Sequence, residues 1–142
     1  MKIDSIYDGV VLDHIRSGNA MEIYQALGLD KLDCPVAMIM RVKSRRMGTK
    51  DLIKIDAPLE LDFDLLGYID SGITVNIICG GQLAEKRKLS LPERIVGVLR
   101  CKNPRCITSV EQGIQHEFFL ADHEKGVYRC AYCEAKYERS NG

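Results

Sequence analysis

The sequence lacks three features that would assign it to a broad functional class. It has no excess of charge of one sign, because 20 lysine and arginine residues balance 20 aspartate and glutamate residues. This balance argues against a protein whose whole surface binds nucleic acid or an anionic membrane. No apolar run approaches the roughly 18 residues that a membrane-spanning helix needs. The N-terminal residues Met1 to Asp4 show no secretory pattern. We therefore expect a cytoplasmic protein without a membrane partner.

Sequence signatures of several enzyme classes are missing as well. There is no glycine-rich phosphate loop of the P-loop or dinucleotide type, and the H-x-E…P-C-x-x-C signature of zinc deaminases is absent. Apolar residues make up 46% of the chain, which is enough for a folded core. A length of 142 residues allows one ordinary domain or two very small ones.

The cysteines are concentrated in the last third of the chain. Cys34 and Cys79 are isolated, whereas the other four form two close pairs separated by 23 residues, Cys101-x4-Cys106 and Cys130-x2-Cys133. In the reducing cytosol such pairs favour metal binding over disulfides. Each pair can form a tight turn that offers two thiolates, and a β-hairpin between the pairs can bring the turns together. The pattern predicts one zinc ion bound by all four cysteines.

Turn residues occur where this arrangement needs them, namely Asn103-Pro104 within the first pair and Lys125-Gly126 between two strand-like runs. Four thiolates complete a tetrahedral shell, so the predicted zinc is structural and not catalytic. It would supply folding energy to a segment of about 50 residues that can hardly form a stable core alone.

The cysteines also admit three other interpretations. They could be buried free thiols. Cys130-x2-Cys133 could be a thioredoxin-like redox pair, but that motif should begin a helix within a βαβ unit. His116 or His123, which lie between the pairs, could replace one cysteine as a ligand.

Residues 1–89 show the order strand, helix, strand, strand, helix, strand. Strands are predicted over 10–15, 36–43, 51–55 and 73–78, and helices over 20–27 and 61–69. This order predicts an α+β fold, a ferredoxin-like βαββαβ sandwich with an antiparallel sheet and both helices on one face. Residues 86–93 resemble a junction, and a short helix is predicted from 90 or 92 to 98. We expect domains at 1–91 and 92–142, the second a small zinc-ribbon-like β domain.

Alternation along the predicted strands separates a core face from an open face. Ile53, Ile55, Val75 and Ile77 should face the helices, whereas the opposite face should carry Leu52, Lys54, Thr74, Asn76 and Ile78. A face that mixes apolar and charged side chains suits a small ligand with a flat apolar part and a charged part. A solvated sheet face or a dimer contact would show the same pattern.

Nucleic-acid binding by a zinc ribbon is the main alternative function. Two basic runs support it, one from Arg41 to Lys50 and one from Lys86 to Lys88. Residues 93–142, however, carry eight Lys and Arg against seven Asp and Glu, and a zinc ion with four thiolates adds a formal charge of about −2. A surface that follows phosphates is normally more basic.

Several segments occur together in a specific order. Val11-Leu12-Asp13-His14-Ile15 comes first, then Lys50-Asp51-Leu52-Ile53-Lys54-Ile55, Thr74-Val75-Asn76 and Ser90-Leu91-Pro92-Glu93-Arg94-Ile95, followed by the four cysteines. Over nearly its whole length the chain resembles the regulatory chains of aspartate carbamoyltransferase, the PyrI family.

The resemblance implies a regulatory subunit without catalytic activity of its own. In that family the N-terminal domain binds nucleotide effectors, chiefly CTP and ATP, and the zinc domain docks onto a separate catalytic chain. Regulatory chains pair through their N-terminal domains. The complex controls the committed step of pyrimidine biosynthesis.

The resemblance also implies an effector site. Asp13 and His14 match positions near the base and ribose, Lys54 and Lys86 match lysines that meet the ribose and phosphates, and Asn76 matches a polar contact deeper in the site. Apolar or backbone contacts around the base are implied for Val11, Leu52 and Ile78. Lysines supply mobile positive charge to a triphosphate, which agrees with these roles.

The chain departs from the family pattern in two places. Better-known members often carry a tyrosine where this chain has Gly81, which implies a loop that holds the base differently. The N-terminal segment is also several residues shorter.

For the catalytic chain, the expected contact surface includes four apolar residues between the cysteine pairs, more than so small a core is expected to bury: Phe118, Phe119, Leu120 and Tyr128. The alternative is that all four belong to the core.

Overall fold

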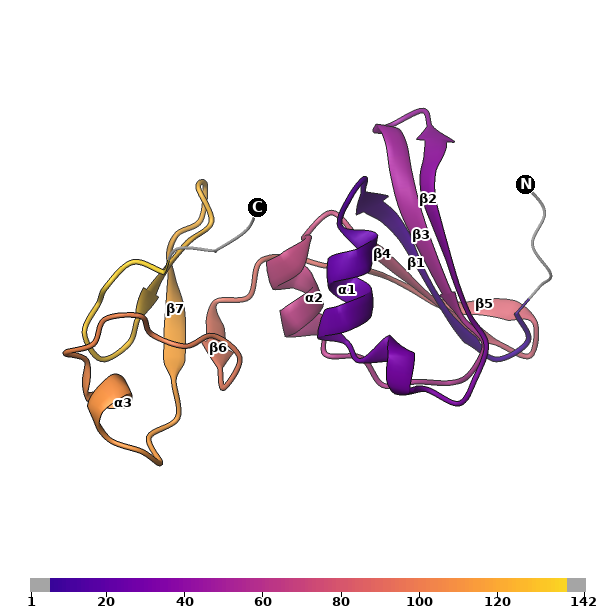
Figure 1. Ribbon diagram of the computed structural model, residues 1–142. Coiled ribbons are helices and arrows are strands. Elements are labelled where there is room, and N and C mark those ends of the chain that lie inside the picture. Colours follow the sequence, from indigo (N-terminus) through magenta and orange to yellow (C-terminus); the bar gives the residue numbers. More distant parts are fainter. Residues whose placement is uncertain (1–5, 138–142) are drawn as a thin grey trace. The chain divides into compact units, whose positions relative to one another are not determined.

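The computed structural model describes residues 6–137, so Met1 to Asp4 lie outside the described residues. The chain divides into two compact units, Met1–Ser90 and Leu91–Gly142 (Figure 1). No helix among residues 6–137 is both long enough and apolar enough to cross a membrane.

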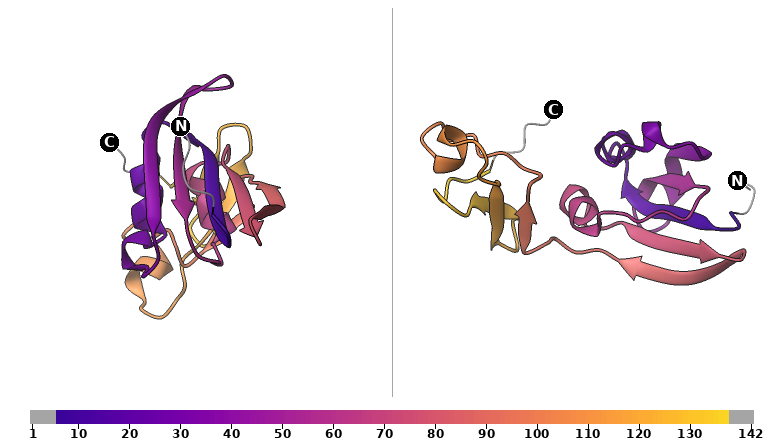
Figure 2. Two further views of the ribbon diagram at one scale, coloured as in Figure 1. Left: turned by 90° about the vertical axis from the view of Figure 1, so that its right-hand side faces the viewer. Right: turned by 90° about the horizontal axis from the view of Figure 1, so that it is seen from below.

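The N-terminal unit is a five-stranded antiparallel sheet with the strand order β2-β3-β1-β4-β5. Figures 1 and 2 show its two helices on one face of the sheet. The predicted ferredoxin-like order is confirmed, with a fifth strand added at one edge. The elements are β1 (Gly9–Arg16), α1 (Ala20–Ala26), a 3-10 turn (Leu29–Lys31), β2 (Val36–Ser44), β3 (Gly48–Ile55), α2 (Phe63–Ile69), β4 (Thr74–Cys79) and β5 (Gln82–Lys88).

The core lies between the sheet and the helices. Ile53, Ile55 and Val75 are fully buried, as the alternation predicted, and they pack in one cluster with Ile23 of α1 and Leu66 of α2. Helix α2 begins at the cap residue Asp62, whose side chain accepts the backbone N–H of Leu65 at 3.0 Å. Alternating apolar residues and a capped helix therefore form the layer that supports the open face.

An irregularity in β1 changes which side chains reach the open face. The register with β3 shifts between Leu12 and Ile15, and His14 adopts a positive φ of 58°. Leu12 and Ile15 are both completely buried. The two residues between them, Asp13 and His14, therefore both lie on the face away from the core, as a β-bulge permits.

Strand β5 was not predicted. Residues 86–93 were interpreted as a junction, and no strand or helix was predicted over 82–85. All seven residues of Gln82–Lys88 are exposed. They nevertheless pair with β4 as an edge strand, with Lys86 opposite Asn76 and Arg87 opposite Val75. On the helix-covered face, the Arg87 guanidinium lies 4.0 Å from the centre of the Phe63 ring.

The C-terminal unit is built on a three-stranded antiparallel sheet in the order β6-β7-β8. The strands are β6 (Arg94–Val96), β7 (Glu117–Asp122) and β8 (Val127–Cys130), and a single helical turn, α3 (Ile107–Val110), precedes β7. Gly126 has a φ of 66° in the β7–β8 connection, so the turn predicted at Lys125-Gly126 is confirmed.

The helix predicted from 90 or 92 to 98 is wrong. Ser90 and Pro92 are typical of helix starts, but only Ile95 of β6 is buried, where it pairs with Phe118. The Pro92 carbonyl also accepts a hydrogen bond from the Tyr128 hydroxyl at 2.6 Å. Tertiary pairing with β7 thus overrides the local helix signal.

The apolar residues expected on the surface are mostly in the core. Phe118, Leu120 and Tyr128 are 1%, 7% and 2% exposed, and only Phe119 is half-buried. The expectation that this group forms an exposed contact surface is therefore wrong for three of its four members. These three side chains share one face of the small sheet, because Phe118 lies opposite Ile95 and Leu120 lies opposite Tyr128.

Candidate metal centre and open sheet face

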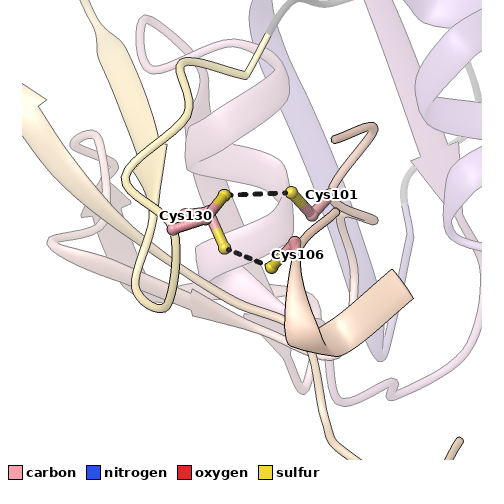
Figure 3. Close-up of side chains that lie close together, drawn as sticks. Cys101, Cys106 and Cys130 are labelled. Atoms are coloured by element: carbon pink, nitrogen blue, oxygen red, sulfur yellow. Dashed lines mark hydrogen bonds between the residues drawn. The ribbon is translucent and has the colours of Figure 1, made fainter. Parts of the chain in front are cut away.

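The structure brings the four predicted cysteines together. Their sulfur atoms all lie within 4.8 Å of one another, although they come from two segments of the chain. The Sγ atoms of Cys101 and Cys133 are 3.6 Å apart, and those of Cys106 and Cys130 are 3.7 Å apart. In Figure 3 the sulfurs of the labelled Cys101, Cys106 and Cys130 point toward one another.

These distances fit a tetrahedral metal site. Zinc–sulfur bonds of about 2.3 Å at tetrahedral angles place the sulfurs about 3.8 Å apart. A disulfide needs about 2.05 Å, and all six cysteines are free. The donor set therefore suits a thiolate-binding cation of the size of zinc.

Backbone hydrogen bonds shape both turns. In the first, Asn103 accepts the Cys106 N–H through its carbonyl and the Arg105 N–H through its side chain, each at 3.1 Å. In the second, the Tyr132 N–H approaches the Cys130 sulfur at 3.4 Å, and Glu134 ends the turn with a φ of 62°. Both turns thus point thiols inward.

The thiols differ in their ease of ionisation. Burial raises the pKa of the Cys101 thiol to about 12 and also raises the pKa of Cys130. The Thr108 hydroxyl, 3.0 Å from the Cys106 sulfur, lowers the pKa of Cys106 to about 6. Four thiolates in so small and dry a site repel one another, so a bound cation must balance their charge.

Neither histidine belongs to the cluster. His116 Nδ1 accepts the backbone N–H of Cys101 at 3.0 Å, and exposed His123 contacts Glu93 at 2.7 Å. Among residues 6–137 the cysteines alone form a cluster that could hold a metal ion. The thioredoxin-like interpretation also fails, because Cys130 ends a strand of an antiparallel sheet and begins no helix.

A row of predicted site residues crosses the open face of the N-terminal sheet. Lys54 on β3 lies opposite Val11 on β1, Val11 lies opposite Asn76 on β4, and Asn76 lies opposite Lys86 on β5. Residues directly opposite each other project from the same face of a sheet. Four strands therefore place these four side chains in one line.

Two further rows flank this line. Asp13, Thr74 and Lys88 form one, and His14 Nδ1 lies 3.1 Å from the Thr74 hydroxyl. Gly9, Ile78 and Leu83 form the other. Leu52, two residues before Lys54 on β3, is half-buried on the same face. The structure thus brings all eight predicted residues to one side of the sheet, with charge at one end and apolar groups at the other.

The Asp13 carboxylate is already engaged on this face. It lies 2.9 Å from the Lys50 ammonium and accepts the His14 N–H at 2.6 Å. Burial alone would raise the pKa of this carboxyl, but the hydrogen bonds from Lys50 and His14 and their positive charge outweigh it and lower the pKa. Asp13 therefore stays ionised and anchors a lysine beside the row.

Sequence reasoning missed three members of this face, Lys50, Thr74 and Lys88, as site residues. Lys88 could have been found, because Lys86 and Lys88 are two residues apart and would share a face in any strand. Thr74 was predicted on this face, but its contact with His14 could not be found, since it depends on the bulge that turns His14 to the same side as Asp13. The ion pair of Lys50 with Asp13 likewise joins two distant segments.

Comparisons with known proteins match the two units of the chain separately. Residues 1–90 match the family described as aspartate carbamoyltransferase regulatory chain, allosteric domain, and residues 93–141 match the metal binding domain of the same regulatory chain.

Curated relatives resemble nearly the whole chain. The aspartate carbamoyltransferase regulatory chain of Clostridium botulinum strain Hall is 47% identical over 96% of this chain and 94% of its own length. That of Clostridium tetani is 48% identical over 97% and 96%, and that of Bifidobacterium longum is 40% identical over 94% and 96%. The chain therefore belongs to the family of aspartate carbamoyltransferase regulatory chains, which are regulatory and not catalytic subunits.

Proposed function

We propose that this chain is an allosteric subunit that binds nucleotide effectors, CTP and ATP, on its open sheet face. Its C-terminal unit holds one structural zinc ion and docks onto an aspartate carbamoyltransferase catalytic chain. In this way it controls the committed step of pyrimidine biosynthesis.

The row from Lys54 to Lys86 carries the nucleotide proposal. Three strand spacings of about 4.8 Å separate the two lysines, so they span about 14 Å. That span suits the triphosphate and ribose of an extended nucleotide, with Asn76 in the middle offering a donor and an acceptor. Asp13 and His14 adjoin the row and can bind sugar hydroxyls.

Zinc is the proposed metal because four thiolates in a tetrahedral arrangement select it. Bound there, zinc would supply folding energy by linking two distant turns of a small unit. The Thr108 hydroxyl lies 3.0 Å from the Cys106 sulfur, and the Tyr132 backbone N–H donates to the Cys130 sulfur at 3.4 Å; both contacts would orient the thiolates. The site needs reduced thiols, in keeping with a cytoplasmic protein.

Exposed apolar residues beside the cysteine turns form the proposed contact surface for the catalytic chain. Ile107, Val110 and Tyr132 are 45%, 65% and 50% exposed. They replace the buried residues first expected in this role. Their position next to the metal ligands means that loss of zinc would disturb the same surface. Self-pairing of regulatory chains is proposed for the N-terminal unit, in whose sheet β2 and β5 are the two edge strands among residues 6–137.

Titration calorimetry on three lysine variants tests the effector site. Lys54→Ala and Lys86→Ala should each weaken CTP and ATP about ten- to a hundredfold, since a charge-assisted contact is worth about 1.5–3 kcal/mol. The corresponding nucleosides should lose less, and the effect should shrink as salt rises. Lys31→Ala, an exposed lysine outside the sheet, is the control.

Unchanged affinity in both Lys54→Ala and Lys86→Ala would place the nucleotide site elsewhere. If the wild-type protein binds neither nucleotide, even with the catalytic chain present, the proposed effector function is wrong. An equal loss in Lys31→Ala would indicate a general electrostatic effect without a defined site.

A further inference from the structure

Tyr7 is an exposed aromatic residue beside the β4–β5 turn, at the end of the sheet where the apolar row of the open face lies. Its side chain is 68% exposed, the largest fraction among the large apolar side chains of residues 6–137. It lies two residues before β1. Neither the metal site nor the proposed lysine row uses it.

The structure holds Tyr7 against the turn between β4 and β5. The Gly81 N–H donates to the Tyr7 carbonyl at 2.8 Å, and the Gly80 N–H donates to the Asp8 side chain at 2.9 Å. Gly80 and Gly81 have φ angles of 61° and 77°, the conformation that a two-residue hairpin turn requires. The backbone of the segment before β1 is thus fixed to this turn.

The Tyr7 ring occupies the space beside Gly81. A Cβ atom on Gly81 would lie 3.7 Å from Cδ1 of the ring, which is ordinary van der Waals contact. A large side chain at position 81 would therefore compete with the ring for this space. With glycine there, the Tyr7 ring has room beside the turn at this end of the sheet.

The rows of the open face lead toward this ring. The row of Lys54 and Lys86 is followed by the apolar row of Gly9, Ile78 and Leu83, about 7 Å further along the strands. Leu83 is 56% exposed. The Gly80-Gly81 turn and Tyr7 come next. A nucleotide whose phosphates and ribose lie along the lysine row, with Asp13 and His14 on its other side, would place its base on this apolar part of the face.

We propose that Tyr7 is a base-stacking, specificity-determining residue of the nucleotide site, a role that rests on the proposed function. An aromatic ring held by its backbone offers a flat apolar surface to any base. Because purines overlap such a ring more than pyrimidines do, Tyr7 favours ATP over CTP.

The test compares ATP, CTP and inorganic tripolyphosphate by titration calorimetry on the full chain. Tyr7→Ala should weaken ATP about tenfold and CTP less, in line with about 1–3 kcal/mol per stacked base. Tripolyphosphate has no base, so its affinity should not change. Tyr7→Phe keeps the ring and should bind ATP like the wild type. Met21→Ala, an exposed residue on α1, is the matched control.

The outcomes separate the role of Tyr7 from the nucleotide site itself. Wild-type protein that binds ATP, with unchanged affinity in Tyr7→Ala, overturns the stacking role and leaves the proposed function in place. Equal losses for ATP and tripolyphosphate also overturn it, because Tyr7 would then only support the turn. Wild-type protein that binds no nucleotide overturns both.

Discussion

At the scale of single residues, Asp13 links the charge of the open face to pH. Its pKa is lower in the folded protein than the ordinary value of 3.8, because the hydrogen bonds and positive charges outweigh burial. A depressed carboxyl pKa stabilises the fold above the ordinary value, and this contribution is lost as the pH falls through the folded pKa. The ion pair with Lys50 is therefore intact at neutral pH and breaks in acid.

Asp13→Asn should lower the free energy of unfolding at pH 7 by about 1 kcal/mol at most, as expected for a partly exposed pair. The difference from the wild type should shrink as the pH falls below 3.8 and through the folded pKa, because the Asp13 carboxyl is then protonated in the folded as well as in the unfolded state. Urea unfolding at pH 7 and at a series of acidic pH values measures it. A difference that persists in acid would assign the effect to packing instead.

The second prediction at this scale concerns metal binding by the cysteines. Cys106→Ser and Cys130→Ser should each lose the metal, because three thiolates leave the shell open and the small unit depends on it. Cys79→Ser, at an exposed free cysteine, should retain one zinc per chain. Elemental analysis of the purified variants measures the zinc content per chain. Metal-free wild type, or metal loss in Cys79→Ser, would contradict the assignment.

At the scale of secondary-structure elements, Asp51 joins three segments. Its side chain, completely buried at the core side of β3, accepts backbone N–H groups from Gly18 and Ala20 at the start of α1 and from Arg41 in β2. Arg41 has a φ of 61° at a register shift in β2. One carboxylate thus accepts hydrogen bonds from backbone N–H groups at both a helix start and a bulge.

Asp51→Ala should destabilise the N-terminal unit by about 3 kcal/mol or more, because three backbone donors lose a charged acceptor in a buried site. Asp56→Ala, at an exposed carboxylate one residue beyond β3, should cost little. Denaturant unfolding of the full chain compares the two. Similar small losses would show that water replaces the carboxylate at no great cost.

At the scale of the whole molecule, the two units should separate in function. A chain that ends at Ser90 keeps all five strands and both helices of the first unit. We expect it to fold and bind nucleotides but not to associate with catalytic chains. Size-exclusion chromatography of mixtures tests this. Retained association would place the main interface in the first unit.

Metal removal from the intact complex tests whether the contact with the catalytic chain depends on the metal site. A thiol-blocking mercurial should release zinc and dissociate the regulatory from the catalytic chains, because the proposed contact residues Ile107 and Tyr132 adjoin the ligands. Nucleotide binding to the released chain should persist. A complex that survives complete zinc loss would separate the interface from the metal.

Local patterns in the sequence determined much of this protein. The spacing of the cysteine pairs was enough to predict the cluster, because short turns set the distance within each pair. The alternation through Ile53 and Ile55 identified the core face, because successive side chains of a strand point in opposite directions. The order of strands and helices was likewise sufficient for the ferredoxin-like fold.

Only the tertiary structure decided the rest, because strand pairing depends on contacts between distant segments. Strand β5 has no apolar alternation of its own and exists because β4 offers an edge, which brings Lys86 into line with Lys54. Pairing with β7 made a strand of residues that locally resemble a helix start, and it buried Phe118. The place of Tyr7 beside Gly81 likewise depends on a hydrogen bond between residues 74 positions apart, which no local pattern encodes.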